Sequence, residues 1–239
     1  MHRRRPVDVN EFLRSTPWVQ AVPHSVRQRV LDDVYEHSYA VGDVVARKNE
    51  AAQSWIGVME GLLKLSDVHR SGKPIMFTGV PTGDWIGEGT LLKRELRRYD
   101  IVSVANTRTA NLPASTFRWL LDTCIEFNHI VMARLNERLA QFIGMMEIDR
   151  LDDPVARVAR AIGALYNPIL SPHLDPVLML SQTELGELVG VSRQTVSSAL
   201  KRLQQEGLVA VQYGRTVVLQ PGLLQHYEER DADVRSPSR

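Results

Sequence analysis

The chain of 239 residues contains a single cysteine, Cys124. One thiol cannot close a disulfide within the chain, and an iron–sulfur cluster needs several thiolate ligands, so the sequence excludes both. The residues around it, 120–125, predict a helix in which Cys124 is a small buried hydrophobic side chain. A redox-sensing thiol is the alternative.

Long hydrophobic runs and a strong charge of one sign are also absent. No apolar run is long enough to cross a bilayer, and no hydrophobic segment follows the basic start as in a signal peptide, so we expect a cytoplasmic protein without membrane contacts. The formal net charge is +1 with 24% charged residues, which excludes a disordered polyanion and a histone-like cation. The histidines lack metal-ligand spacing, so no metal site is predicted, although haem bound through His24 or His129 stays open.

Catalytic motifs are missing as well. The sequence has no nucleophile elbow, no Walker loop, no zinc motif and no Gly-x-Gly-x-x-Gly turn between a strand and a helix. We therefore predict no catalytic residues and no enzymatic activity. A nucleotide-binding module without DNA-binding activity is the remaining rival to the function argued below.

Residues 180–203 predict two short helices joined by a sharp turn. Ser181 and Glu184 form the capping-box pattern that opens a helix, and Gly190 suits a turn that needs a positive φ. Ser192 is a suitable N-cap for the second helix, whose apolar positions recur at helical spacing. The residues that this helix turns away from the core are Arg193, Gln194, Ser197 and Ser198. This pattern is typical of a recognition helix, and a helical hairpin with a merely solvated outer face is the alternative.

Two strands are predicted directly after this hairpin. Residues 209–211 and 216–219 are rich in β-branched side chains, and the turn 213–215 separates them. Such a wing can place Arg215 against a phosphate, while Lys201 lies further along the second helix. The sequence therefore predicts a winged helix-turn-helix that binds double-stranded DNA sequence-specifically. The candidate DNA-binding residues are Ser192, Arg193, Gln194, Ser197, Ser198, Lys201 and Arg215.

Residues 180–220 resemble the DNA-binding domain of the Crp/Fnr family of bacterial transcription regulators, most closely in the segment VSRQTVSSALKRL. The resemblance implies a homodimer that binds an inverted-repeat operator and contacts RNA polymerase. It also implies that Arg193, Gln194 and Ser198 read bases. Gln194 replaces the family's glutamate and Ser198 replaces its arginine, so the operator should differ from the usual half-site because glutamine pairs with adenine whereas glutamate accepts from cytosine.

The N-terminal half predicts an all-β domain behind an amphipathic helical start. Short runs of strand-forming residues alternate with glycine turns, which is typical of a sandwich or jelly roll. The predicted strands are 39–45, 54–59, 62–68, 75–80, 101–104 and 107–112. Together with the C-terminal part this predicts an α+β protein: a β jelly-roll effector domain, a long dimerisation helix and a winged helix-turn-helix.

The β domain resembles the family's cyclic-nucleotide-binding fold, whose phosphate-binding cassette would begin at Trp85-Ile86-Gly87-Glu88. The resemblance implies that Glu88 accepts from a ribose hydroxyl and that Arg98, eleven residues after Gly87, binds a cyclic phosphate. Tyr99 departs from the family's serine or threonine, and Gly89-Thr90 departs from its leucine and glycine. The candidate effector-binding residues are Gly87, Glu88, Arg98, Tyr99, Gln141 and Phe142, the last two corresponding to purine contacts on the long helix.

Three interpretations of this cassette stay open. It binds a cyclic nucleotide such as cyclic AMP, or it binds another small anionic or hydrophobic effector. Alternatively, Gly87, Glu88 and Arg98 only brace the fold. In that case the pocket is vestigial and the protein binds DNA constitutively. The family's oxygen-sensing iron–sulfur mode is excluded by the single cysteine.

A long helix from residue 116 to about 148 is predicted between the two parts. An apolar stripe, Val131, Leu135, Leu139, Phe142 and Met146, indicates a dimer coiled coil, with packing against the β domain as the alternative. Asp153-Pro154 then starts a new helix and forms a hinge. The predicted domains are 1–118 (helices and jelly roll), 119–151 (long helix), 152–228 (winged helix-turn-helix) and 229–239 (disordered tail).

Overall fold

The computed structural model describes residues 8–172, 176–212 and 214–228. The predicted tail 229–239 and Tyr213 of the predicted wing turn lie outside the described residues. The chain divides into two compact units, residues 1–142 with 165–175, and residues 143–164 with 176–239.

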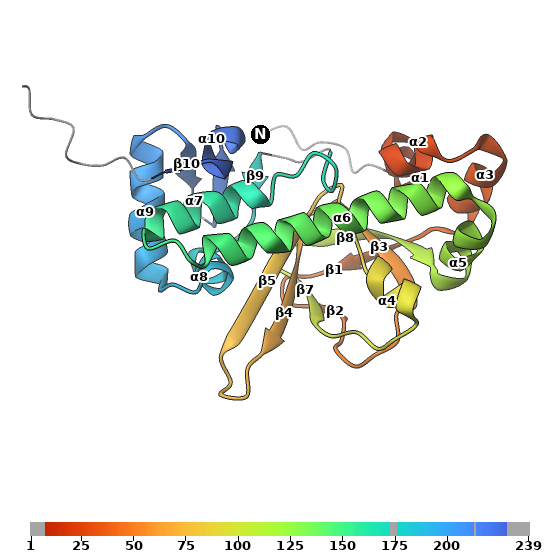
Figure 1. Cartoon of the computed structure of the whole chain (residues 1–239), viewed down its shortest axis with the longest axis horizontal. Coiled ribbons are helices and arrows are strands. Elements are labelled where there is room, and N and C mark those ends of the chain that lie inside the picture. The colour runs from red at the N-terminus through yellow and green to blue at the C-terminus, as the bar shows by residue number, and fades with distance from the viewer. Residues whose placement is uncertain (1–7, 173–175, 213, 229–239) are drawn as a thin grey trace, which may run out of the picture. The chain divides into compact units, whose positions relative to one another are not determined.

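The first unit contains two four-stranded sheets, ordered β1-β8-β3-β6 and β2-β7-β4-β5 (Figure 1). Every strand pairing in them is antiparallel. The strands are β1 Tyr35–Tyr39, β2 Val44–Ala46, β3 Ser54–Glu60, β4 Leu62–Val68, β5 Pro74–Pro81, β6 Trp85–Ile86, β7 Asp100–Ser103 and β8 Thr107–Pro113. The predicted jelly roll and the α+β fold class are confirmed.

The predicted strand 39–45 is divided in the structure. A turn at residues 40–43 separates β1 from β2, and the two strands belong to different sheets. Asp43 makes this turn because its carboxylate accepts from the backbone N–H of Ala40 at 2.7 Å, and Gly42 has φ +89°. A short polar side chain and a glycine at these positions favour a turn over a continuous strand.

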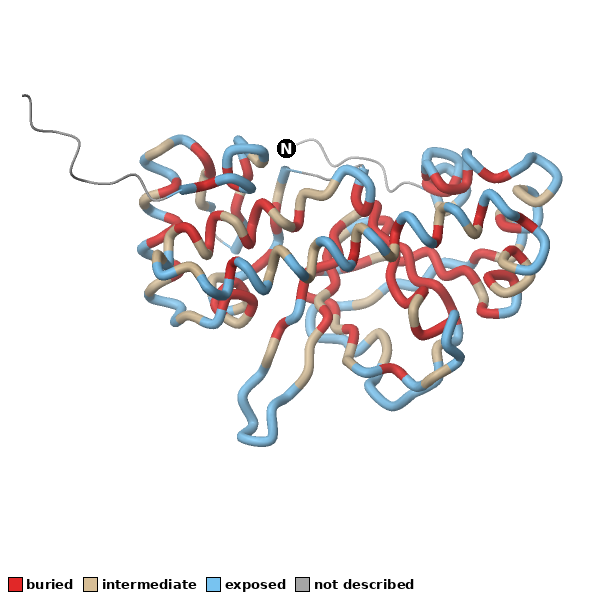
Figure 2. The backbone as a smooth tube through the Cα atoms, viewed as in Figure 1, coloured by how far each residue is buried: buried red, intermediate tan, exposed pale blue. Residues whose placement is uncertain are grey.

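An aromatic cluster forms the centre of the first unit. Trp18, Trp55 and Trp85 lie with ring centroids 4.8–5.2 Å apart, and Phe117 and Phe127 pack against Trp55. Such aromatic pairs add about 0.5–1.5 kcal/mol each beyond the burial of their area. Figure 2 shows that the central strands are buried, whereas the tip of the β4–β5 hairpin is exposed.

Helices flank these sheets. They are α1 Val9–Ser15, α2 Pro17–Ala21, α3 His24–Asp33, α4 Glu88–Lys93, α5 Ala114–Thr123 and α6 Ile125–Ile148. The single helix predicted from residue 116 is therefore two helices that break at Cys124, whose backbone is extended. Asn128 stabilises this break because its side-chain amide donates to the backbone oxygens of Leu121 at 2.8 Å and Cys124 at 3.3 Å, which replaces lost helical bonds. Cys124 is buried, and burial raises the pKa of its thiol.

Helix α6 has two apolar faces rather than the one stripe expected. Val131 is 2% exposed and belongs to the core of the first unit, and Leu135 packs against that core. Leu139 and Met146, by contrast, are exposed. The exposed apolar residues of α6 are Ile125, Met132, Leu139, Ile143 and Met146. The predicted stripe thus mixes residues of an inward face with residues of an outward face.

The second unit contains the predicted winged helix-turn-helix. Its elements are α7 Pro154–Ala164, β9 Val177–Leu178, α8 Gln182–Val189, α9 Arg193–Gln205, β10 Val209–Gln212, β11 Arg215–Val218 and α10 Pro221–Gln225. The strands form one antiparallel sheet in the order β10-β11-β9. Asp153 caps α7 as expected, since its carboxylate accepts from the backbone N–H groups of Val155 and Ala156. The third strand β9 and the helix α10 were not predicted.

Candidate effector and DNA-binding sites

The predicted cassette contains a backbone position, Gly87, whose conformation favours glycine. Gly87 has φ +106° and precedes α4, and no side chain caps this short helix. Glu88, the first residue of α4, is 3% exposed. Its carboxylate accepts a hydrogen bond from the indole N–H of Trp55 at 3.1 Å. The cassette therefore holds a buried carboxylate whose position is fixed by the aromatic core.

Arg97 faces Gly87, whereas Arg98 does not. A methyl group added at Gly87 would lie 3.2 Å from Nη1 of Arg97, and Arg97 is 3% exposed. Within the described part of the chain, Arg97 Nη1 is buried and has no hydrogen-bond partner. The side chain of Arg98 is 74% exposed and pairs with Glu95 at 3.1 Å. The structure thus places Arg98 apart from the other predicted effector residues.

Inward and outward side chains alternate over residues 96–99, where the chain bends at Arg98 and Tyr99 before β7 begins. Leu96 and Arg98 are exposed, while Tyr99 is half-buried and packs against the core. Burial, and then the nearby Glu88, raise the pKa of the Tyr99 hydroxyl, so it stays protonated and can donate at neutral pH. Burial lowers the pKa of Arg97.

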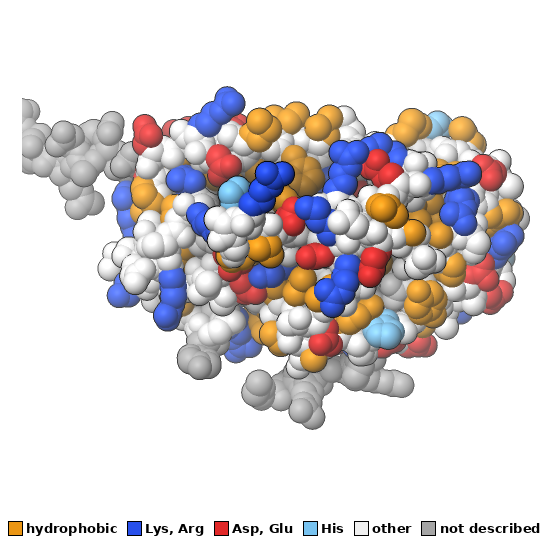
Figure 3. Space-filling view, turned by 90° about the horizontal axis from the view of Figure 1, so that it is seen from below, with side chains coloured by type: hydrophobic (Ala, Val, Ile, Leu, Met, Phe, Trp, Pro, Cys, Tyr) orange, Lys and Arg blue, Asp and Glu red, His pale blue; other side chains and the backbone are white. Residues whose placement is uncertain are grey.

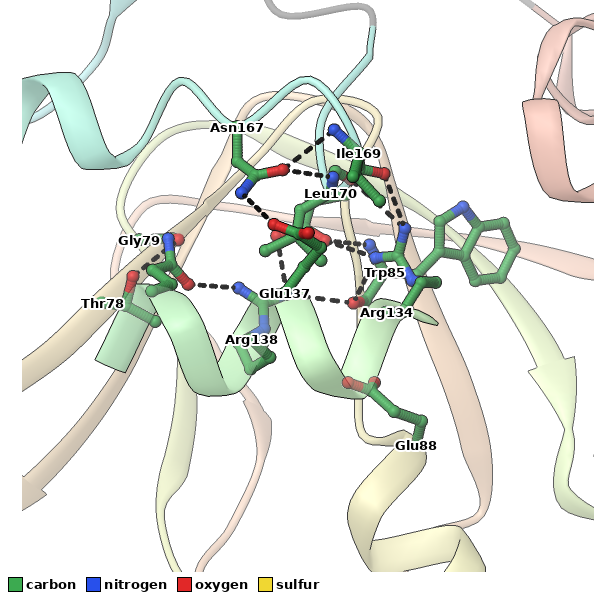
Figure 4. A network of polar contacts seen from close by, with 12 residues as sticks. Thr78, Gly79, Trp85, Glu88, Arg134, Glu137, Arg138, Asn167, Ile169 and Leu170 are labelled. Carbon is green, nitrogen blue, oxygen red and sulfur yellow. Dashed lines mark hydrogen bonds and ion pairs between the residues drawn. The ribbon is translucent and has the colours of Figure 1, made fainter. Parts of the chain in front are cut away.

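Helix α6 closes the other side of the cassette with a buried ionic network (Figure 4). Arg134 and Arg138 both donate to the carboxylate of Asp84, at 2.6 Å and 2.8 Å respectively. Arg138 also donates to the side-chain oxygen of Gln141 at 2.8 Å. Burial alone would lower the pKa of Arg138, but the carboxylates of Asp84 and Glu88 raise it. Arg138 therefore interacts electrostatically with Glu88 of the cassette. Phe142, also predicted to contact effector, is half-buried.

Arg97 is the side chain of this region that an anionic ligand would complement. Its Nη1 is buried and, among the described residues, has no hydrogen-bond partner. Burial lowers the pKa of Arg97, and the carboxylate of Glu50 acts in the opposite direction. A buried donor without an acceptor is costly, and a negatively charged group bound beside Gly87 would supply that acceptor.

The recognition helix α9 presents the expected polar face. Ser192 caps it by accepting from the backbone N–H of Thr195 at 3.1 Å, and Gly190 has φ +68° in the preceding turn. The apolar residues of α9 are buried, whereas Arg193, Gln194 and Ser198 are exposed and Ser197 is half-buried. The structure therefore brings the predicted base-reading side chains together at one end of α9, and Lys201 is exposed one turn beyond them.

A groove adjoins this end of α9. It encloses about 420 Å³ and is lined by residues from the start of α8, from α9 and from the wing, among them Gln182, Thr183, Arg193 and Arg215. Arg215 is exposed and donates to the side chain of Gln212 at 2.7 Å. The groove therefore offers two guanidinium groups and the N-terminus of α8 to a phosphate backbone.

Charge is otherwise mixed on the molecular surface. On the face shown in Figure 3, lysine and arginine alternate with aspartate and glutamate and do not gather in one large patch. Arg202, which follows Lys201 on α9, is paired with Glu206 at 3.2 Å. Strong binding therefore depends on particular contacts rather than on a general attraction for polyanions.

Several site residues were not predicted. Arg97 was passed over because spacing selected Arg98, and the Asp84–Arg134–Arg138 network has no sequence pattern of its own. Gly186 was also missed: a methyl group there would lie 2.7 Å from the backbone oxygen of Val191, so the helix-turn-helix needs a glycine at this position. A glycine inside the predicted helix was the available signal.

The residues considered for haem or metal show no assembled site. His24 and His129 are exposed. Among the described residues, no three His, Cys, Asp or Glu side chains gather as metal ligands would. In the same part of the chain, no helix is long and apolar enough to cross a membrane.

Two family models match the chain in sequence order. The model of the cyclic nucleotide-binding domain matches residues 36–124, and the model of the Crp-like helix-turn-helix domain matches residues 156–227. The chain is a member of the Crp/Fnr family. As such it is a transcription regulator with a cyclic nucleotide-binding domain and a helix-turn-helix DNA-binding domain.

Relatives within the Crp/Fnr family align over most of the chain. The cyclic AMP receptor protein of Thermus thermophilus is 28% identical over 187 residues, which covers 78% of this chain and 85% of that protein. The cAMP-activated global transcriptional regulator of Haemophilus influenzae is 25% identical over 215 residues, which covers 89% of this chain and 96% of that protein. These relatives are transcription regulators, not enzymes.

Solved structures show the same fold. FixK2 from Bradyrhizobium japonicum matches with a TM-score of 0.66 at 16% identity, covering 83% of this chain and 99% of that one. The c-di-GMP responsive global regulator of Xanthomonas campestris matches with a TM-score of 0.61 at 20% identity, covering 82% of this chain and 99% of that one.

Proposed function

We propose that the chain is an effector-responsive regulator that binds an inverted-repeat promoter site as a homodimer. The observation that carries this proposal is the exposed polar end of α9, where Arg193, Gln194 and Ser198 lie beside a groove that contains Arg215. A helix with such an end enters the major groove while its flanks contact phosphates. Contact with RNA polymerase at the promoter is part of the same proposal and follows from family membership.

Base reading is assigned to Arg193, Gln194 and Ser198, with Ser192, Ser197, Lys201 and Arg215 as supporting contacts. Arginine pairs with guanine through two hydrogen bonds, and glutamine pairs with adenine in the same way. Lys201 and Arg215 are exposed cations suited to phosphates. The half-site should therefore contain a guanine read by Arg193 and an adenine read by Gln194.

Selection of binding sites from random duplex DNA tests this assignment. We expect an inverted repeat whose half-site centres lie one helical turn, about 34 Å, apart. Arg193→Ala should lower affinity for the selected site by about 1–3 kcal/mol and relax its preference at one base pair. Lys201→Ala is the matched control. Loss of a phosphate contact weakens binding to all DNA sequences alike and reduces the salt dependence of the affinity. Recovery of no sequence preference would contradict the proposal.

The homodimer is supported by the outward face of α6. Ile125, Met132, Leu139 and Met146 are exposed at intervals of one heptad, and Ile143 lies between the last two. Large apolar side chains exposed in this repeat are typical of a coiled-coil seam. A second copy of the same face would bury them, and the two-fold axis of such a pair matches the inverted repeat.

For the effector we propose a cyclic nucleotide, with cyclic AMP as the first candidate. Arg97 would bind the cyclic phosphate in place of the expected Arg98, because Arg97 is buried beside Gly87 while Arg98 is exposed. Glu88 and Tyr99 would contact the ribose and phosphate, and Gln141 on α6 the base. The effector controls DNA binding only to the extent that it prefers one conformation of the chain over another.

Calorimetry with cyclic AMP tests this site. Arg97→Gln should abolish measurable binding, or weaken it at least tenfold, because it removes the buried guanidinium that faces the anion. Arg98→Gln is the matched control and should bind as the wild type does, since its side chain is 74% exposed. If Arg98→Gln lost cyclic AMP binding and Arg97→Gln kept it, the phosphate contact would be assigned to Arg98 instead. No heat with any cyclic nucleotide, together with unchanged operator binding, would support a constitutive regulator with a vestigial pocket.

A further inference from the structure

The indole N–H of Trp55 is directed at the carboxylate of the predicted cassette. Trp55 lies in β3 and is fully buried. Its Nε1 donates to Oε2 of Glu88 at 3.1 Å, and Glu88 is itself 3% exposed. Among the described residues, this is the one hydrogen bond that the Glu88 side chain receives. The orientation of this buried carboxylate therefore depends on a single donor.

The Trp55 ring is held in one orientation by its neighbours. Four aromatic rings have their centroids 4.8–5.8 Å from its own, those of Trp18, Trp85, Phe117 and Phe127. The guanidinium of Arg134 lies 5.7 Å from the centroid of the same ring. A side chain packed in this way has few alternative positions, because protein interiors are close-packed. Trp55 is thus a fixed donor for the more flexible side chain of Glu88.

The chemistry of Glu88 limits what a ligand can present to it. An ionised carboxylate only accepts hydrogen bonds, so the ligand group beside it must be a donor. In a cyclic nucleotide whose phosphate bridges the 3′ and 5′ oxygens, the 2′-hydroxyl is the one ribose group that can donate. This assignment rests on the cyclic-nucleotide proposal above, in which Arg97 binds the phosphate beside Gly87 and Glu88 contacts the ribose.

We propose that Trp55 is a positioning residue that makes the effector site selective for a ribose over a 2′-deoxyribose. By holding Oε2 of Glu88, the indole N–H fixes the carboxylate and leaves Oε1 to accept from the 2′-hydroxyl. A group that is fixed before binding loses no side-chain freedom when the ligand arrives. Without the indole N–H, the carboxylate loses the donor that compensates its burial and is free to turn away from the hydroxyl. The phosphate contact remains.

Calorimetry of the full chain with cyclic AMP and 2′-deoxy cyclic AMP tests the proposal. The wild type should bind cyclic AMP about tenfold more tightly or better, because the 2′-deoxy nucleotide lacks a hydrogen bond to a charged group. Trp55→Phe keeps an aromatic ring and removes the donor. It should weaken the binding of cyclic AMP and leave that of the 2′-deoxy nucleotide nearly unchanged, so that the preference falls to about threefold or less. A role in packing alone would weaken both nucleotides alike.

Trp18→Phe is the matched control. Trp18 belongs to the same aromatic cluster and is 5% exposed, but among the described residues its buried indole nitrogen has no hydrogen-bond partner. The same substitution there should keep the selectivity of the wild type. A double-mutant cycle shows whether Trp55 acts through Glu88: in a Glu88→Ala background, Trp55→Phe should cause no further loss of cyclic AMP affinity.

A measurement that needs no substitution at Trp55 covers the case in which circular dichroism shows Trp55→Phe to be unfolded. The chain has four tryptophans, and their indole N–H signals are observed by NMR with isotope-labelled tryptophan. The Trp55 signal is the one that persists in each of the variants Trp18→Phe, Trp85→Phe and Trp119→Phe. It should shift more with cyclic AMP than with the 2′-deoxy nucleotide, and equal shifts would overturn the proposal.

Failure of this proposal is distinguishable from failure of the cyclic-nucleotide site. If the wild type binds neither nucleotide, the cyclic-nucleotide proposal falls and the role of Trp55 falls with it. If the wild type is selective and folded Trp55→Phe keeps that selectivity, or loses affinity for both nucleotides equally, only the role of Trp55 is overturned. Equal affinity of the wild type for the two nucleotides would overturn it as well.

Discussion

Close contact between Gly57 and Trp85 shows how single residues set the shape of the cyclic nucleotide-binding domain. Gly57 lies in β3 opposite Trp85 of β6, and a methyl group at Gly57 would lie 2.4 Å from the Trp85 ring. Trp85 is buried within the aromatic cluster, so it has little room to move. The glycine is required here for space rather than for backbone conformation.

Gly57→Ala should therefore destabilise the first unit by about 1–3 kcal/mol, the usual cost of overpacking a core. Urea unfolding followed by tryptophan fluorescence measures this, because all four tryptophans lie in residues 1–142. Gly89→Ala is the matched control: no atom lies within 4 Å of the added methyl group, and Gly89 sits in helix α4. We expect the control to be neutral or slightly stabilising.

Residue types in the cassette were predictable from sequence, but the arginine that lies beside Gly87 was not. The cassette's Gly87 and Glu88 lie together as expected, and Tyr99 lies beside them. The spacing of eleven residues from Gly87 selects Arg98, whereas the structure turns Arg97 towards Gly87. The chain bends at residues 98 and 99 before β7 begins at Asp100, and this bend has no sequence signal from which the inward arginine could be predicted.

At the scale of elements, the recognition helix depends on its cap. Ser192 accepts from Thr195 at 3.1 Å and satisfies a backbone donor that would otherwise lack a partner. Ser192→Ala should cost about 1 kcal/mol, so the amides at the start of α9 should exchange hydrogen about fivefold faster. Hydrogen exchange with mass spectrometry measures this directly. Ser198→Ala, an exposed position inside the helix, should leave exchange unchanged or slower.

The helix-turn-helix was predictable because its signals are local. Caps at Ser181 and Ser192 and the turn at Gly190 each act within a few residues, and the structure contains all three. Helix α6 was less predictable because two surfaces compete for its apolar residues. Its sequence shows which positions are apolar, whereas the placement of the jelly roll decides that Val131 packs inward while Leu139 stays exposed.

At the scale of the whole molecule, the outward face of α6 should control assembly. Leu139 is 58% exposed in the single chain, so Leu139→Lys should leave the fold of the monomer intact. In the proposed dimer the same change buries two lysines in the seam and should shift the equilibrium towards monomer at least tenfold. Sedimentation velocity over a range of concentrations measures it. Ala140→Lys, exposed but outside the apolar stripe, is the control and should remain dimeric; dissociation of both variants alike would contradict the seam.

The exposed face of α6 carries one amide among its apolar residues. Asn136 is exposed between Met132 and Leu139, at the heptad position that Ile143 occupies one repeat later. In a parallel, unstaggered pair Asn136 meets its own copy and the two amides bond to each other. A stagger of one heptad would set one amide against Ile143 and the other against His129, so the contact between the two amides would be lost. In the proposed dimer, Asn136 would weaken the seam but select a single alignment of the two chains, and that alignment would fix the two-fold axis that the proposed inverted repeat requires.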